Sequence, residues 1–212
     1  MPKRRKVGNL LGLAVLCYLA QGPMHPYEMG RTLQHNRDDR SIRFNTGSLY
    51  MVFKQLEKAG FIAEAGTSRE GQLPERTAYA LTDSGRAEQR DWLRELVAEP
   101  QYEYPHFVAA LSLIAVLSPD EAVELLTNRR QRLAASRAEL RDAIDSALAA
   151  GLHPLFQVEE EYRLALLDAD AAFTDGLIAH ITDPETGWGP MWARFHTGPA
   201  SDPGTSAERT SP

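Results

Sequence analysis

Apolar residues recur at helical spacing in three short segments near the N-terminus. The first covers residues 7–20 and ends at the sequence QGP, a strong helix stop. The second covers residues 26–35 and begins with a proline, which suits the first position of a helix because no partner is needed there for its missing N–H. The third covers residues 47–59 and is followed by a glycine. The pattern therefore predicts three short helices.

The pattern changes after Gly60. Residues 61–65 and 77–81 alternate roughly between apolar and polar positions, which predicts two strands. The polar, Gly- and Pro-containing loop between them predicts a hairpin. Thr82 is then suited to cap a helix that runs to about Ala98. Three helices followed by a hairpin is the order of elements in a winged helix-turn-helix.

The second half of the chain has the pattern of long helices. The sequence PQYEYP at residues 100–105 predicts a hinge, and an apolar helix is expected over residues 107–117. The sequence SPDE at residues 118–121 is a capping box with proline at the first helical position, so a long helix should begin there and extend to about residue 150. A further helix is expected over residues 156–181.

These elements predict a fold that is mainly α with a small β-hairpin. We expect a winged helix-turn-helix DNA-binding domain at residues 1–99 and a helical dimerisation domain at residues 100–183. Residues 184–212 contain a short aromatic segment and a tail with nothing to bury, so we expect the tail to be disordered.

Each long helix carries a stripe of apolar residues that needs a partner helix. We expect one compact subunit to be unable to bury both stripes, so the sequence predicts that they supply a homodimer contact. The residues concerned are Leu126, Leu133, Leu140, Ile144, Phe173 and Leu177.

The third predicted helix begins with short hydrogen-bonding side chains and has a lysine one turn further on. The major groove of DNA admits one helix, whose N-terminal side chains then face base edges. A lysine one turn along can reach a phosphate. The candidate DNA contacts are Asn45, Thr46, Ser48, Tyr50 and Lys54. The alternative interpretation is that the first residues only cap the helix and that the tyrosine belongs to the core.

Arginines outside this helix are further candidates for contacts with nucleic acid. Arg43 lies in the loop before the helix, and Arg69 and Arg76 lie in or beside the hairpin loop. Each could contact a phosphate or the minor groove. Solvation alone is an equally valid interpretation of the hairpin arginines.

Charge is divided unevenly along the chain. Residues 1–82 hold 12 Lys and Arg against 7 Asp and Glu, although the whole chain has a net charge of −6. A basic N-terminal part favours a local contact with a polyanion. The single cysteine indicates a reducing compartment, and the N-terminal apolar run is too short to span a bilayer and lacks a good cleavage site. We therefore expect a cytoplasmic protein with no membrane partner.

Enzyme classes find little support in the sequence. The 6 histidines are scattered without metal-ligand spacing, and there is no Gly-rich phosphate loop. We expect neither catalysis nor a metal or cofactor. The rival to a DNA-binding regulator is a winged-helix protein-interaction module without operator binding.

Three segments carry a specific resemblance. GPMHPYEM at residues 22–29, TGSLYMVFKQLEKAGFI at 46–62 and RTAYALTDSGR at 76–86 closely resemble the PadR family of bacterial transcriptional regulators. The long C-terminal helices are similar to those of its longer-tailed subgroup. Pro26 departs from the glycine usual in the family, with little expected consequence.

The resemblance implies a homodimeric repressor that binds double-stranded operator DNA and releases it when a small aromatic or drug-like effector binds. By motif, Thr46, Gly47, Ser48, Tyr50 and Lys54 fall on the recognition helix, and Arg69 and Arg76 on the wing. The sequence does not locate an effector pocket. Candidate walls are Trp92, Tyr102, Tyr104, Phe107 and Phe156, with core packing as the alternative role of the tryptophan.

Overall fold

The structure is a computed structural model that describes residues 5–68, 76–101 and 103–196. The chain divides into two compact units, one up to Glu103 and one from Tyr104 onward. Each unit is described by itself. Among the described residues, no helix combines the length and the apolar character needed to cross a bilayer.

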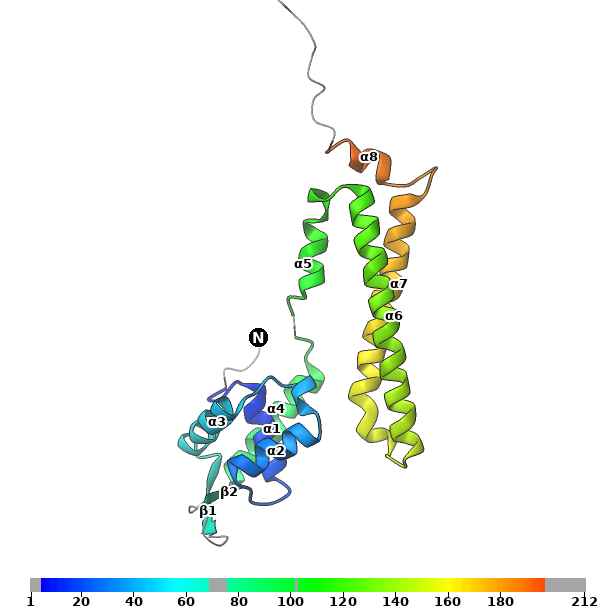
Figure 1. Ribbon diagram of the computed structural model, residues 1–212. Coiled ribbons are helices and arrows are strands. Elements are labelled where there is room, and N and C mark those ends of the chain that lie inside the picture. Colours follow the sequence, from blue (N-terminus) through cyan, green and yellow to red (C-terminus); the bar gives the residue numbers. More distant parts are fainter. Residues whose placement is uncertain (1–4, 69–75, 102, 197–212) are drawn as a thin grey trace, which may run out of the picture. The chain divides into compact units, whose positions relative to one another are not determined.

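The N-terminal unit has the element order of a winged helix-turn-helix (Figure 1). Its elements are α1 (Leu10–Leu19), α2 (Pro26–His35), the short 3-10 helix η1 (Asp38–Arg40), α3 (Thr46–Lys58), β1 (Ile62–Ser68), β2 (Arg76–Leu81) and α4 (Asp83–Ala98). The expected fold class is confirmed. The second helix and the helix after the hairpin have the bounds expected from their proline and threonine start signals.

Helix α1 is the centre of the N-terminal core. It is apolar nearly all round, and Leu11, Val15 and Leu16 are completely buried. Helices α3 and α4 pack on α1, and α2 packs on α3. Leu33 of α2 and Phe53 of α3 belong to the same core cluster as these α1 residues. A helix that is buried on several sides needs apolar residues around its whole circumference. This explains why the sequence of α1 resembles the apolar region of a signal peptide although α1 lies in the core of a globular unit.

The wing is an antiparallel hairpin with one irregularity. Ile62 pairs with Leu81, and the register shifts between Glu64 and Gly66. Gly66 has φ +132, a conformation open mainly to glycine. An isolated bridge between Met24 and Tyr79 joins the loop before α2 to the hairpin. The wing is thereby fixed to the helices at its base.

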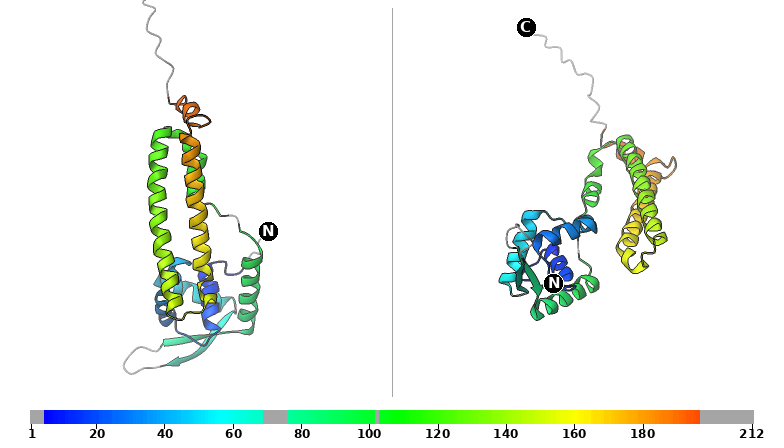
Figure 2. Two further views of the ribbon diagram at one scale, coloured as in Figure 1. Left: turned by 90° about the vertical axis from the view of Figure 1, so that its right-hand side faces the viewer. Right: turned by 60° about the horizontal axis from the view of Figure 1, so that its bottom comes forward.

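The C-terminal unit is built on a pair of long antiparallel helices, seen side by side in Figures 1 and 2. Its elements are α5 (His106–Ser112), the 3-10 helix η2 (Ile114–Val116), α6 (Pro119–Ala149), the 3-10 helix η3 (Pro154–Gln157), α7 (Val158–Thr182) and α8 (Gly189–Ala193). Ser118 caps α6 by accepting a hydrogen bond from the backbone N–H of Glu121 at 3.3 Å. The long helix therefore starts where the capping box predicted.

The single helix expected over residues 107–117 is wrong. Helix α5 ends at Ser112, whose hydroxyl donates to the carbonyl of Ala109, and Leu113 leaves helical geometry with φ −117 and ψ 5. A serine hydroxyl that bonds to nearby backbone competes with continued helix. The chain then makes the 3-10 turn η2 before α6 begins.

The pairing of α6 with α7 corrects the predicted dimer contact. The four apolar stripe residues of α6 are only 4–8% exposed, because α7 of the same chain and its neighbours cover them: Leu126, Leu133, Leu140 and Ile144. Ion pairs of Arg129 with Asp170 and of Arg137 with Asp168 also join the two helices. These four residues therefore form an internal core of one chain and are not the predicted dimer contact.

Candidate nucleic-acid interface

The first turn of α3 is closed by two reciprocal hydrogen bonds. The Asn45 side chain accepts from the backbone N–H of Ser48 at 2.8 Å, and the Ser48 hydroxyl accepts from the backbone N–H of Asn45 at 2.9 Å. This capping box satisfies two N–H groups that a helix start leaves without partners. Asn45 and Ser48 thus have a structural role that does not depend on nucleic acid.

The remaining polar residues of the α3 start lie at the surface. Thr46 and Lys54 are exposed, and the Tyr50 side chain is 40% exposed. Leu49 and Phe53, on the other side of the helix, are about 1% exposed and belong to the core. The helix therefore presents a hydroxyl, a phenol and an ammonium group on its open side while its apolar side fixes its position.

Gly47 leaves the backbone of the α3 start uncovered. A Cβ at this position would have the Asn45 Oδ1 atom at 3.4 Å as its nearest neighbour, so packing does not require a glycine there. A residue without a side chain allows the helix backbone to approach another molecule closely. The first N–H groups of a helix also attract anions such as phosphate.

Helix α2 holds α3 at close range. A Cβ on Gly30 would lie 3.3 Å from Leu49 Cδ2, so even alanine there would require the Leu49 side chain to shift by a few tenths of an ångström. The ring of His25, the N-cap residue of α2, meets the Tyr50 ring edge-on with centroids 6.5 Å apart. The sequence analysis did not single out Gly30, although a glycine inside a predicted helix is a signal of close packing.

The loop before α3 is tied to α1 by a small hydrogen-bond network. The Tyr18 hydroxyl donates to Asp38 Oδ2 at 2.6 Å, and the Asn36 amide donates to the Tyr18 oxygen at 2.7 Å. Burial and the hydrogen bond with Asp38 raise the pKa of Tyr18, which keeps its phenol protonated. Arg43 is exposed in the same loop, two residues before the N-cap of α3.

The predicted wing arginines are only partly described. Arg76 is the first residue of β2, where its backbone pairs with Ser68, and its side chain lies outside the description. Arg69 lies outside the described residues. Their contacts with DNA stay a prediction.

The predicted effector residues are divided between the two units. Trp92 is buried, with the Arg5 guanidinium 5.2 Å from its ring centre, and Arg5 also pairs with acidic residues of α4. Tyr104 and Phe156 are largely exposed, and Phe107 packs edge-on against Phe173. Tyr102 lies outside the described residues. The burial of Trp92 favours its core-packing alternative, and an effector contact by these residues stays a prediction.

Within residues 5–68, 76–101 and 103–196, no group of three or more His, Cys, Asp or Glu side chains could hold a metal ion. Cys17, the single cysteine of the sequence, is half-buried.

The helices, the wing and the exposed start of α3 define the class: the protein is a winged helix-turn-helix protein. The family model described as "Transcriptional regulator PadR-like family" matches residues 15–91. "Negative transcriptional regulator PadR" of Bacillus subtilis (strain 168) is 30% identical over 142 residues, which are 67% of this chain and 77% of that protein. The chain belongs to the PadR-like family of transcriptional regulators, as the three sequence segments indicated.

Solved structures have the same fold over both units. Bacillus subtilis PadR in complex with operator DNA matches with a TM-score of 0.65 and 24% identity, covering 81% of this chain and 98% of that one. Bacillus subtilis PadR in complex with p-coumaric acid matches with a TM-score of 0.62 and 20% identity, covering 84% and 97%. The Vibrio cholerae virulence activator AphA matches with a TM-score of 0.57 and 16% identity, covering 80% and 96%.

Proposed function

We propose that this transcriptional regulator is a cytoplasmic, non-enzymatic homodimeric repressor that binds double-stranded operator DNA and releases it when a small molecule binds. The observation that carries the proposal is the exposed polar side of α3, held rigidly by its apolar side in a winged helix-turn-helix. Family membership and the relatives bound to operator DNA and to p-coumaric acid support the same function.

The residues of α3 make two kinds of contact with DNA, one with base edges and one with phosphates. Thr46 and Tyr50 are short or rigid hydrogen-bonding groups near the helix start, where base edges are read. Gly47 lets the helix start approach the groove, and Lys54 is placed one turn further on, where it reaches a phosphate. Asn45 and Ser48 hold the first turn in shape.

The dimer contact moves from α6 to the open side of α7. Three large apolar residues of this helix are 54–65% exposed and follow one another at helical spacing: Val158, Tyr162 and Leu166. The small residues Ala165 and Ala169 beside them are exposed as well. An apolar stripe along a helix is a surface that a second helix covers. Phe173, which was also predicted for the dimer contact, packs on Phe107 of the same chain.

Replacing Leu166 by Glu should dissociate the dimer, because each subunit would then bring an unpaired carboxylate into an apolar contact. The measurement is the molar mass in solution by sedimentation equilibrium. The matched control is Ala135→Glu, an exposed position of α6 on the side away from α7. A dimeric Leu166→Glu protein would exclude this stripe from the interface.

Replacing Lys54 by Ala should weaken binding to all DNA sequences. The plot of log affinity against log salt concentration has a negative slope. Its magnitude should decrease by about 0.9 for each lost phosphate contact, hence by about 2 for a dimer. The measurement is fluorescence anisotropy at several salt concentrations, with DNA from upstream of the protein's own gene and with random DNA.

The control for this variant is Arg90→Ala, an exposed position of α4, which packs on α1. If wild-type protein shows no salt-dependent binding, the interaction-module alternative stands instead. If the wild-type protein binds DNA and Lys54→Ala binds it with the same affinity and salt dependence, Lys54 does not contact DNA.

A further inference from the structure

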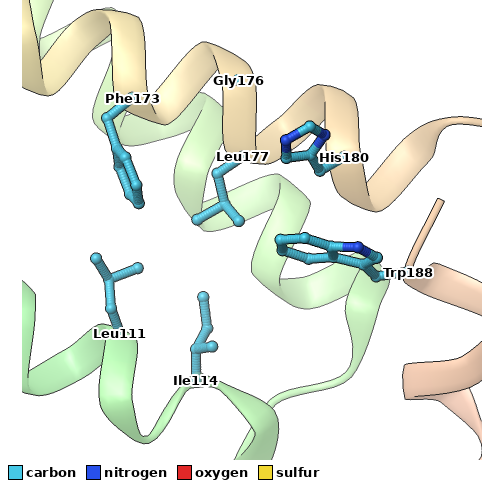
Figure 3. A pocket seen from close by; sticks show the side chains of 7 residues that line it. All are labelled: Leu111, Ile114, Phe173, Gly176, Leu177, His180 and Trp188. Carbon is cyan, nitrogen blue, oxygen red and sulfur yellow. The ribbon is translucent and has the colours of Figure 1, made fainter.

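A pocket of about 370 Å³ lies within the C-terminal unit, between α5, η2, α7 and the segment before α8 (Figure 3). Leu111 and Ile114 point into it from one side, and Phe173 and Leu177 point toward them from α7. The rings of His180 and Trp188 close the other end, with centroids 5.1 Å apart. The pocket wall is largely apolar, and its side-chain hydrogen-bonding groups are the His180 imidazole, which can accept a hydrogen bond, and the Trp188 indole N–H, which can only donate one.

The pocket has large aromatic surfaces that the chain itself does not cover. Phe173 and Trp188 are 52% and 47% exposed, although both lie against the pocket. Aromatic faces left open to water favour an occupant that stacks on them. Apolar pockets with a few placed polar groups are the usual form of small-molecule sites.

Gly176 points to the same conclusion. It lies inside α7, where glycine is less favourable than alanine. A Cβ there would meet no atom within 4 Å, so no neighbour among the described residues explains the missing side chain. Glycine in such a place lets another molecule lie against the helix backbone.

The elements around the pocket favour a small molecule over a helix of a second copy. Leu111 and Ile114 already lie over this end of α7, so a second helix would have to displace them. A cavity of about 150 Å³ can accommodate benzene, so two rings fit the space available.

We propose that this pocket binds a planar two-ring aromatic molecule whose single hydrogen-bonding group meets His180. The proposal rests on the proposed function, for which it supplies the effector site and the class of effector. The same wall provides a route of response: Phe107 of α5 packs on Phe173, and the Arg129 guanidinium lies 3.5 Å from the Phe107 ring centre. An occupant beside Phe173 therefore acts on α5, the helix that directly follows the hinge from the DNA-binding unit.

The test uses 2-naphthol and naphthalene with the full-length protein, and measures binding by equilibrium dialysis. We expect saturable binding of 2-naphthol at one site per chain, and at least tenfold weaker binding by Gly176→Leu, whose side chain fills the pocket. Gly176→Ala checks that a side chain at this position leaves the fold intact. Ala135→Leu, on the outward side of α6, is the matched control and should bind as wild type does.

The histidine has its own readout. In His180→Leu the two compounds should bind with equal affinity, because the affinity for 2-naphthol falls and the affinity for naphthalene does not change. Unchanged binding of 2-naphthol by Gly176→Leu would overturn the proposal. A change of oligomeric state in Gly176→Leu with no naphthol binding by wild type would also overturn it and assign the pocket to a second copy.

DNA binding is measured separately, with the upstream fragment used for Lys54→Ala. If naphthol binds and DNA does not, the pocket stands and the proposed function fails. If DNA binds and naphthol does not, the proposed function stands and the pocket fails.

Discussion

Replacing Gly47 by Glu should abolish operator binding without harming the fold. The new carboxylate would stand at the start of α3, where a DNA backbone would come closest, and like charges placed together cost several kcal/mol. We expect affinity to fall by more than about 100-fold, since a dimer carries the change twice. The measurement is anisotropy with the upstream DNA fragment at low salt.

The stability of Gly47→Glu should stay equal or increase although its DNA binding is lost. A Cβ at Gly47 has no neighbour closer than 3.4 Å. Glutamate has a better helix propensity than glycine, and a negative charge in the first turn stabilises a helix by about 0.3–1 kcal/mol. The melting temperature should therefore stay equal or rise while DNA binding is lost.

The matched control is Ala87→Glu, which adds the same charge at an exposed position of α4. It should bind DNA nearly as wild type does. If Gly47→Glu binds within threefold of wild type and is folded, the start of α3 does not face DNA.

Local signals in the sequence predicted the N-terminal elements well. The proline at the start of α2 and the threonine before α4 act within one helical turn, so their effect is visible without the fold. The same holds for the polar start of α3, although the division between capping and open residues needed coordinates. Asn45 and Ser48 bond to each other, whereas Thr46 and Lys54 do not take part in that pair.

The sequence could not show what covers an apolar stripe. Heptad-like spacing of Leu126, Leu133 and Leu140 is the same whether the partner helix belongs to the same chain or to a second copy. In the structure α7 covers them, and α7 in turn has a stripe of its own on the opposite side. A long apolar helix with two such sides serves both an internal core and an external contact.

The pocket was beyond sequence reasoning for a related reason. Its walls come from residues near 111, 176 and 188, and no local pattern links these positions. Four of the five predicted effector residues are described: one is buried, two are exposed and one is packed beside the pocket. Long-range packing, not residue type, decides which aromatic side chain borders a cavity.

Replacing Gly85 by Ala should destabilise the fold at the junction between the wing and α4. The added Cβ would lie 1.9 Å from the carbonyl oxygen of Phe61 and 2.8 Å from Leu81 Cδ1. That carbonyl accepts hydrogen bonds from the backbone N–H and the hydroxyl of Thr82, at 3.1 and 3.0 Å, so it cannot move without breaking them. We expect a loss of about 3 kcal/mol, at the upper end for overpacking, and a fall in melting temperature of more than about 10 °C by calorimetry.

Gly8→Ala is the matched control, because a Cβ at Gly8 would meet nothing within 4 Å and its φ is not positive. It should melt at the same temperature as the wild-type protein.

The wing and α3 share the turn at Gly60. The Gly60 carbonyl accepts hydrogen bonds from the hydroxyl of Thr82 at 2.8 Å and from the hydroxyl of Ser84 at 2.7 Å. Displacing α4 therefore disturbs the far end of the recognition helix, and Gly85→Ala should lose DNA binding together with stability. An unchanged melting temperature would mean that α4 and the turn at Phe61 do not approach as closely as the structure places them.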